Sequence, residues 1–199
     1  MRKSLASGWF RLAPVVAIVV LLGACTTTTI TPELVRPAPE RKIDTVVVAD
    51  LASADELLDL YIPHLRQGLV ARLREAGDFR EVIVGSAATA SPAAPAPFTA
   101  IIVSGKLTEI DKGSTAARWI IGFGAGRAIA RATFEIKDAG GATLARFESR
   151  KAYSGGAGIG GANFLDMEDL VRKLGEETAN SLIRWSNGEP LEPPAKKSQ

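Results

Sequence analysis

An uncharged, mainly apolar run near the start of the chain, ending at its only cysteine, limits how the rest can fold. Residues 12–24 (LAPVVAIVVLLGA) follow a polar, basic stretch without acids, and Cys25 comes immediately after them. The run is too short for a membrane-spanning helix, which needs roughly 20 apolar residues, but it has the length of a signal-peptide core. We therefore expect residues 1–24 to be a signal peptide. A single cysteine also excludes a disulfide framework.

The end of this run resembles the lipobox of bacterial lipoproteins. Leu22, Gly23 and Ala24 match the leucine and the two small residues that signal peptidase recognises, and Cys25 matches the modified cysteine. The resemblance implies a lipoprotein with diacylglycerol on the Cys25 sulfur and often a further chain such as palmitate, which together anchor a protein stably. Thr26, where Asp would be the alternative, resembles the pattern of export to an outer membrane, facing the periplasm. The alternative is an unmodified thiol in an ordinary signal peptide.

Composition divides the remainder of the chain into three parts. Residues 25–42 are rich in Thr and Pro and are expected to form a flexible tether behind the lipidated cysteine. Residues 43–186 are long enough for a single domain, interrupted by an Ala- and Pro-rich loop over residues 85–97. Residues 187–199 are polar and Pro-rich, so we expect a disordered tail.

The net charge of +2 is a property of the leader rather than of the domain. Three of the 24 basic residues precede Cys25, and none of the 22 acidic residues does, which leaves 21 bases against 22 acids. A nearly neutral mature chain provides no bulk electrostatic attraction for nucleic acid.

The first half of the domain reads as a strand followed by a helix. Residues 45–49 form a β-branched run typical of a strand buried on both faces. Ser53 and Glu56 have the spacing of a capping box, so we expect a helix to begin there and to end at Gly77. Pro63 removes a backbone donor and predicts a kink or a restart.

The second half reads as strands followed by a helix. Strands are expected at 81–84, 98–111, 132–137 and 142–153, with a hairpin turn at 138–141, and a last helix begins near Asp166. The expected order is β-α-β-β-β-β-α. This predicts an α/β fold, an α+β sandwich with a mixed, mainly antiparallel sheet and two helices packed on it.

Catalytic chemistry lacks its usual residues. His64 is the only histidine, so the sequence offers no metal site, and we expect His64 to be a polar residue on a helix flank. We therefore expect no enzyme, no catalytic residue and no cofactor besides the covalent lipid. One alternative stays open: Gly156 to Gly161 match G-x-G-x-x-G and could hold a nucleotide, although no βαβ unit follows.

A second glycine-rich segment is a candidate interaction surface, for a partner or for self-association. Large apolar and basic side chains lie beside glycines there, where a bulged turn between strands is the simpler interpretation. The residues concerned are Arg118, Trp119, Gly122, Phe123, Gly124, Gly126 and Arg127. With Arg131, Arg146 and Arg150, these arginines could also contact anionic headgroups if they share one face.

Several short motifs together resemble a family of bacterial lipoproteins grouped as domain of unknown function 4410. The motifs are Gly105 to Ile110, residues 112–114, Arg118 with residues 122–126, and residues 136–138 with Gly141 and Leu144. The element order is more distantly similar to envelope lipoproteins of the curli-secretion-channel type. Membership of this family implies little about activity. Our hypothesis is a non-enzymatic envelope module that binds an envelope protein or assembles with one, and the alternative is a ring-forming secretion or outer-membrane assembly subunit.

Overall fold

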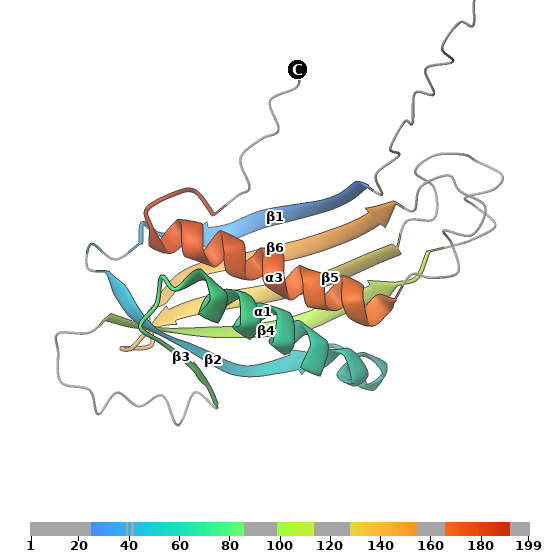
Figure 1. The fold of residues 1–199 in the computed structure, drawn as a ribbon, viewed down its shortest axis with the longest axis horizontal. Coiled ribbons are helices and arrows are strands. Elements are labelled where there is room, and N and C mark those ends of the chain that lie inside the picture. Colours follow the sequence, from blue (N-terminus) through green and yellow to red (C-terminus); the bar gives the residue numbers. More distant parts are fainter. Residues whose placement is uncertain are drawn as a thin grey trace, which may run out of the picture.

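Among the described residues, six strands form one sheet, and two α helices cover one of its faces (Figure 1). The computed structural model describes residues 25–38, 40, 42–85, 99–113, 128–154 and 166–191. The strand order is β1-β6-β5-β4-β2-β3. The predicted α+β arrangement, a mixed sheet with two helices packed on it, is confirmed.

The sheet is antiparallel on one side and parallel on the other. Its strands are β1 (Cys25–Val35), β2 (Ile43–Ser53), β3 (Glu81–Val84), β4 (Thr99–Asp111), β5 (Ala128–Asp138) and β6 (Thr143–Ser154). β1, β6, β5 and β4 pair antiparallel, whereas β2 lies parallel to both β4 and β3. The parallel pair β2 and β3 needs a crossover, and the first helix supplies it.

The expected first helix is two elements. Asp55, not Ser53, caps a 3-10 helix, η1 (Glu56–Tyr61), by accepting a hydrogen bond from the Leu57 amide at 2.9 Å. The α helix α1 (Ile62–Ala76) starts afresh with Pro63 in its first turn, where the missing donor costs little. The predicted restart is confirmed, as is the end at Gly77, where φ is 70°.

The second α helix, α3 (Met167–Ser186), begins as expected. The side chain of Asp166 caps it by accepting from the amide of Glu168 at 2.9 Å. Its apolar stripe, from Met167 to Trp185, is buried against the sheet. None of the helices in the described ranges has the length and apolarity that a membrane crossing requires.

The core lies between the helices and the sheet. On β5 every second residue from Ala128 to Ile136 is buried, so one face of the strand belongs to the core. Phe134 stacks on its cross-strand partner Phe147 with ring centroids 5.6 Å apart. Gly105 leaves room for this stack, because an added Cβ would lie 2.7 Å from the Phe134 ring.

The two helices touch each other backbone to backbone at a pair of glycines. A Cβ on Gly68 would overlap the Arg172 carbonyl, lying 2.8 Å from its carbon, and a Cβ on Gly175 would lie 2.8 Å from the Leu69 nitrogen. Glycine at both positions therefore allows α1 and α3 to lie side by side over the sheet (Figure 1).

Two segments predicted to be unstructured are ordered where the structure describes them. The prediction of a flexible tether over 25–42 is wrong for residues 25–35, which form β1 along the edge strand position beside β6. Ile30 of β1 is buried in the core, and Pro32 is tolerated because it lies at a register shift on an edge strand. In the expected tail, Leu191 is buried as well, at 2% exposure. Residues 192–199 lie outside the described ranges.

The predicted hairpin between β5 and β6 is confirmed. Gly141 adopts a φ of 85°, which an L side chain rarely accepts, and the Asp138 carboxylate accepts a hydrogen bond from the Ala142 amide at 2.8 Å. The predicted loop over residues 85–97 lies outside the described residues, apart from Gly85.

Candidate functional site

One end of the sheet collects the features that an attachment to a membrane would involve. Cys25 is the first residue of β1 and pairs with Ser154 at the end of β6. Tyr153 pairs with Ala128 at the start of β5, and Ile129 pairs with Asp111 at the end of β4. We call this end of the sheet, with η1 beside it, the anchor end. Because β1 starts at Cys25 itself, no slack separates the cysteine from the fold.

The sheet face opposite the helices is covered by no described element, and we call it the uncovered face. Charged side chains of β4, β5 and β6 pair across it. Arg131 lies between two carboxylates, with Nε 2.9 Å from Glu109 and Nη1 3.1 Å from Glu148. Arg150 is the cross-strand neighbour of Arg131. Arg131 is thus matched by acids, and this part of the face is of mixed charge.

A second charge cluster on the uncovered face centres on Glu135. Its carboxylate accepts hydrogen bonds from Arg146 at 2.7 Å and from Thr143 at 3.0 Å, and Lys137 Nζ lies 2.9 Å away. Hydrogen bonding to Lys137 and then to Arg146 lowers the pKa of Glu135 to about 2, although burial opposes this shift. The carboxylate therefore stays ionised over the whole physiological range.

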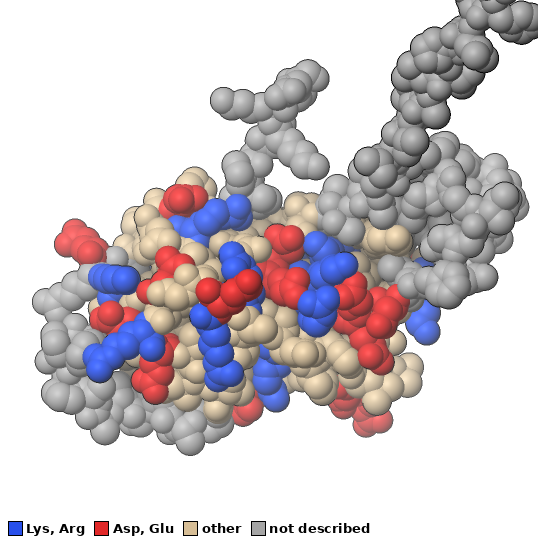
Figure 2. Space-filling model, in the orientation of Figure 1, with Lys and Arg blue, Asp and Glu red and all other residues tan. Residues whose placement is uncertain are grey.

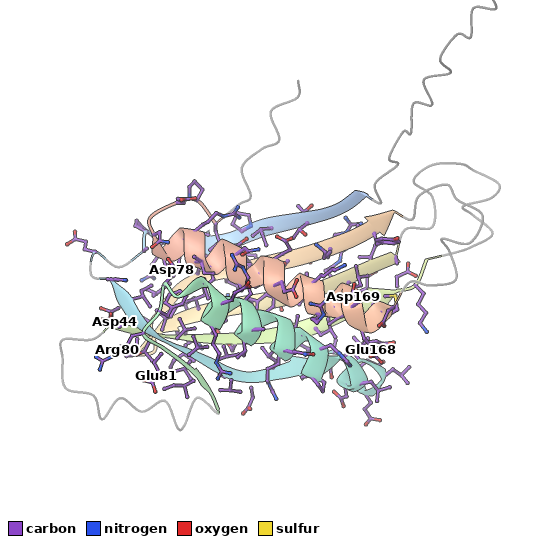
Figure 3. All side chains as sticks on the ribbon, in the orientation of Figure 1. Asp44, Asp78, Arg80, Glu81, Glu168 and Asp169 are labelled. Atoms are coloured by element: carbon purple, nitrogen blue, oxygen red, sulfur yellow. The ribbon has the colours of Figure 1, made fainter. Side chains whose placement is uncertain are left out.

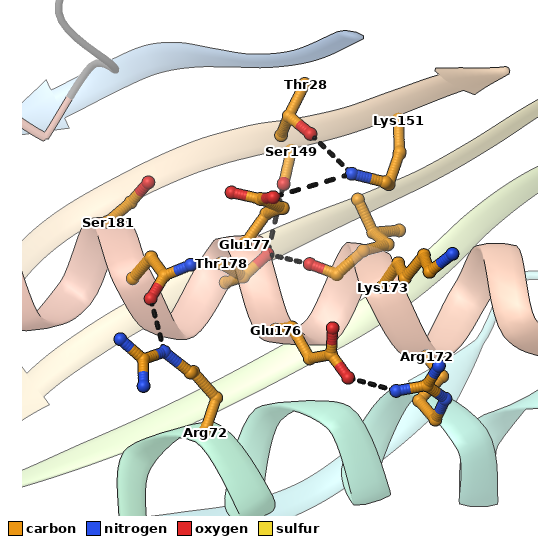
Figure 4. Close-up of polar contacts among 12 residues, drawn as sticks. Thr28, Arg72, Ser149, Lys151, Arg172, Lys173, Glu176, Glu177, Thr178 and Ser181 are labelled. Carbon is orange, nitrogen blue, oxygen red and sulfur yellow. Dashed lines mark hydrogen bonds and ion pairs between the residues drawn. The ribbon is translucent and has the colours of Figure 1, made fainter. Parts of the chain in front are cut away.

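A buried polar layer lies beneath α3, on the core side of β6 (Figure 4). Lys151 is only 3% exposed, and its Nζ donates to Thr28 Oγ1 at 3.0 Å and lies 3.6 Å from Glu177 Oε1. Beside it, Thr178 Oγ1 donates to one of two acceptors, Ser149 Oγ at 3.0 Å or the Leu174 carbonyl at 2.9 Å. This layer joins β1, β6 and α3, and so fixes β1 to the helix layer.

The helix face is also of mixed charge (Figure 2). Arg172 bridges Asp169 and Glu176 on α3, and Lys173 lies 2.8 Å from Asp169. Burial raises the pKa of Asp169, but hydrogen bonds from Lys173 and Arg172 outweigh it, so the net shift is downward. Across the helix pair, Arg72 Nε donates to Asn180 at 2.6 Å. Of these contacts the Arg72 hydrogen bond joins α1 to α3, whereas the others lie within α3.

The histidine is placed as the sequence predicts. His64 lies on the flank of α1, with 30% of its side chain exposed, and its Nε2 is 3.5 Å from Glu168. Glu168 and Asp169 lie at the anchor end of α3, whereas Asp44, Asp78, Arg80 and Glu81 gather near the opposite end (Figure 3). Within the described ranges, no group of three or more His, Cys, Asp and Glu side chains is arranged to hold a metal ion.

Most sequence-predicted site residues lie outside the described part of the chain. This applies to the peptidase motif Leu22, Gly23 and Ala24, to the glycine segment from Arg118 to Arg127, and to the loop from Gly156 to Gly161. Cys25 is described as the first residue of β1. Of the arginines suggested to share a face, Arg131, Arg146 and Arg150 lie on strands β5 and β6.

Sequence reasoning missed the buried lysine and the helix-crossing glycines, although each left a signal. Lys151 has the same strand parity as Ala145 and Phe147, which are buried, so alternation alone predicts that it points into the core. Gly68 and Gly175 each interrupt a helical pattern in which glycine is unfavourable, which indicates a packing requirement.

Comparison with solved structures finds distant similarity of the whole arrangement. The PelC dodecamer from Paraburkholderia phytofirmans has 20% identity and a TM-score of 0.44, covering 76% of this chain and 96% of that one. A point variant of the same dodecamer has 19% identity and a TM-score of 0.45, and the match covers 74% of this chain and 96% of that one. A neuraminyllactose-binding hemagglutinin homologue from Helicobacter pylori has 10% identity and a TM-score of 0.36, and the match covers 78% of this chain and 87% of that one. At these values none carries an argument about binding or assembly here.

No curated protein matches the chain. The family model described as a domain of unknown function, DUF4410, matches residues 26–157. The matched region runs from β1 through β6 and includes α1, the hairpin and both charge clusters of the uncovered face, and it leaves out α3. As the motifs predicted, and over more than half of its length, the chain belongs to the DUF4410 family.

Proposed function

We propose that this protein is a lipid-anchored module of the cell envelope, facing the periplasm, that binds or assembles with another envelope component and is not an enzyme. Cys25 would carry the lipid, and the uncovered face of the sheet would receive the partner. The observation that carries the proposal is that Cys25 begins an edge strand of the same sheet whose other face no described element covers.

The leader and the geometry of β1 support the anchor. A lipobox-like sequence ends at the first residue of β1, so removal of residues 1–24 would leave the described fold intact. The contact from Lys151 to Thr28 holds β1 three residues from the cysteine. A pull on the anchor would therefore be transmitted to the core rather than to a loose tether.

The uncovered face supports a binding role because the charged side chains of its two clusters are partly exposed and ordered by one another. Arg131 and Glu148 expose 33% and 28% of their side chains, and Arg146 exposes 51%. Charged groups already held in place lose little freedom when a partner of complementary charge pattern docks. A mixed pattern favours a protein partner over a purely anionic surface.

The anchor is tested by Cys25→Ser, with Thr29→Ser as a matched control at an exposed position of β1. The control is expected to incorporate labelled palmitate and to fractionate with membranes, because the thiol is unchanged. Cys25→Ser is expected to lose the label and to accumulate as uncleaved or soluble protein. Unchanged labelling and membrane retention in Cys25→Ser would contradict the anchor.

The binding face is tested by site-specific photo-crosslinking in intact envelopes. A photoreactive residue at Thr133, on the uncovered face, is expected to give one discrete adduct, and the same residue at Gln67, on the exposed side of α1, is not. Charge reversal by Arg146→Glu should then reduce the Thr133 adduct severalfold. Adducts of equal yield from both positions, or from neither, would reject the uncovered face as the binding site.

A second candidate function, a ring-forming assembly subunit, is favoured by the two free edges of the sheet. Among the described residues, β1 and β3 each pair on one side only. Pairing the β1 edge of one copy with the β3 edge of the next is a head-to-tail contact, and such contacts close into rings when the rotation permits. Native mass measurement of detergent-extracted protein decides: a discrete large ring supports this candidate, and a single-chain mass at micromolar concentration excludes it.

A further inference from the structure

Two leucines at the anchor end are more exposed than any other large apolar side chains in the described residues. Leu57 and Leu60 of η1 expose 77% and 76% of their surface, whereas the next values lie at or below 44%. They are three residues apart on a 3-10 helix, so they project from the same side of it. Together they form one small apolar ridge, which we call the leucine ridge.

The leucine ridge is held rigidly on the sheet. Asp55 caps η1, Ser53 Oγ donates to Asp59 at 2.5 Å, and the Ala54 amide donates to the Leu107 carbonyl of β4 at 2.8 Å. Two exposed leucines on a loose loop could fold back onto the protein. These contacts instead keep both side chains directed away from the core.

The ridge and Cys25 lie at the same end of the molecule. The anchor end contains the start of β1, the end of β6, the start of β5 and the end of β4. β2 runs parallel to β4 and therefore ends toward the same side, and η1 comes shortly after β2. Figure 1 shows the short turn leading into α1, which contains η1, and the start of β1 at the same, right-hand end of the sheet, on opposite sides of it. Four strand spacings separate β1 from β2, so the two strands lie about 19 Å apart across the sheet.

We propose that the leucine ridge enters the interface of the bilayer that holds the Cys25 lipid, as a second contact that sets the orientation of the domain. This inference rests on the proposed lipid anchor. A diacylglycerol on the first residue of an edge strand brings the whole anchor end to the membrane surface. Leu57 and Leu60 are then the described apolar side chains that face it.

The charge around the ridge specifies the kind of lipid surface. Asp55, Glu56 and Asp59 lie on or beside η1, and Glu168 lies at the anchor end of α3 (Figure 3). This acidic surrounding repels anionic headgroups. The occupant is therefore a zwitterionic lipid surface, such as one of phosphatidylethanolamine, rather than an anionic one.

The test measures the depth of a nitroxide label in the lipidated protein reconstituted into phosphatidylethanolamine–phosphatidylcholine vesicles. A thioether-linked Cys25 has no free thiol, so Leu60→Cys supplies the only reactive site. The matched control is Leu34→Cys, an exposed leucine of β1 that lies nine residues, or about 30 Å, further along the strand. The label at position 60 is expected to be accessible to oxygen and protected from a soluble nickel complex, and the label at 34 to show the reverse.

Two further measurements sharpen the result. Adding Leu57→Ser to the position-60 protein should make the label shallower, and adding phosphatidylglycerol to the vesicles should do the same. A position-60 label that is as aqueous as the one at 34, in protein that remains vesicle-bound, overturns the inference and leaves the anchor standing. An unmodified Cys25 with no vesicle association overturns the proposed anchor and this inference together.

Discussion

Glu135 couples the folded state to pH, because three donors converge on its carboxylate. Its pKa is lowered from 4.5 to about 2, so the interaction stabilises the fold fully above the unfolded pKa and is lost as the pH falls from about 4.5 through about 2. Its partners Arg146 and Lys137 are half-exposed, so solvent screening reduces the contribution to about 1 to 2 kcal/mol.

Glu135→Gln is therefore expected to lower the free energy of unfolding at pH 7 by about 1 to 2 kcal/mol. The difference from the native protein should shrink as the pH falls from about 4.5 and vanish only below about 2, where Glu135 becomes protonated and, like Gln, uncharged. Urea unfolding followed by circular dichroism at pH 7, 4 and 2 measures this. Glu189→Gln, at an exposed position, is the control and should show no difference; a pH-independent effect of Glu135→Gln would contradict the assignment.

Lys151 is a buried cation with two partners, and its ion pair is not expected to contribute much net stability. Glu177 keeps 43% of its side chain exposed and can be solvated without Lys151. We expect Lys151→Met to change the free energy of unfolding by less than about 1 kcal/mol, and Lys151→Ala to lower it by about 2 kcal/mol or more through a cavity. Thermal and urea unfolding compare the two. Equal losses for Met and Ala would show that the charge itself stabilises the fold.

At the scale of the elements, the crossing of α1 and α3 depends on two glycines. Away from a contact, Gly→Ala in a helix is stabilising by about 1 kcal/mol. At Gly68 the new methyl group would overlap the Arg172 carbonyl of the other helix, which is backbone and cannot turn aside. We expect Gly68→Ala to lower the free energy of unfolding by about 1 to 3 kcal/mol.

The control for this prediction is Gln67→Ala, one residue earlier on the exposed side of α1, which should be neutral or slightly stabilising. Urea unfolding of both variants gives the comparison. A Gly68→Ala variant as stable as Gln67→Ala would mean that the helices do not approach as described.

The second prediction at this scale concerns β1. Pairing with β6 protects the β1 amides that donate to it, which are every second one because β1 is an edge strand, whereas a tether would protect none. Hydrogen exchange of the mature protein should therefore show slow exchange for the part of β1 around Ile30, and fast exchange after Thr28→Pro, which removes the hydroxyl that Lys151 reaches and strains the strand. Fast exchange throughout β1 in the unaltered protein would restore the tether interpretation.

At the scale of the whole molecule, the proposed lipid on Cys25, at the start of a strand, would tie the orientation of the domain to the bilayer. Leu34, near the far end of β1, should stand about 30 Å from the membrane surface with little spread. A ten-residue Gly/Ser linker inserted after Cys25 should keep the protein in membranes but broaden this distance, because such a linker is a flexible coil. Energy transfer from a donor at position 34 to a lipid acceptor measures it. An unchanged, narrow distance with the linker present would show that Cys25 does not control orientation.

Much of the element layout is readable from local pattern. The hairpin at Asp138 to Gly141, the end of α1 at Gly77 and the cap at Asp166 follow from residues that impose one backbone geometry on their neighbours. The apolar stripe of α3 and the alternation of β5 follow from periodicity. These signals act over a few residues, so they need no knowledge of the rest of the chain.

Three features depended on partners distant in sequence. Residues 25–35 have no strand pattern of their own and become β1 because β6 offers an unpaired edge more than a hundred residues later. Glycine is required at positions 68 and 175 only because α1 and α3 cross there. Lys151 can be buried only because Thr28 and Glu177 contact its ammonium group. The order of the elements is a local property, set by short motifs and by periodicity, and the expected compartment rests on the motif at residues 22–25. The start of β1 at Cys25 and the placing of Leu57 and Leu60 at the same end of the sheet arise from long-range pairing, which no local pattern specifies.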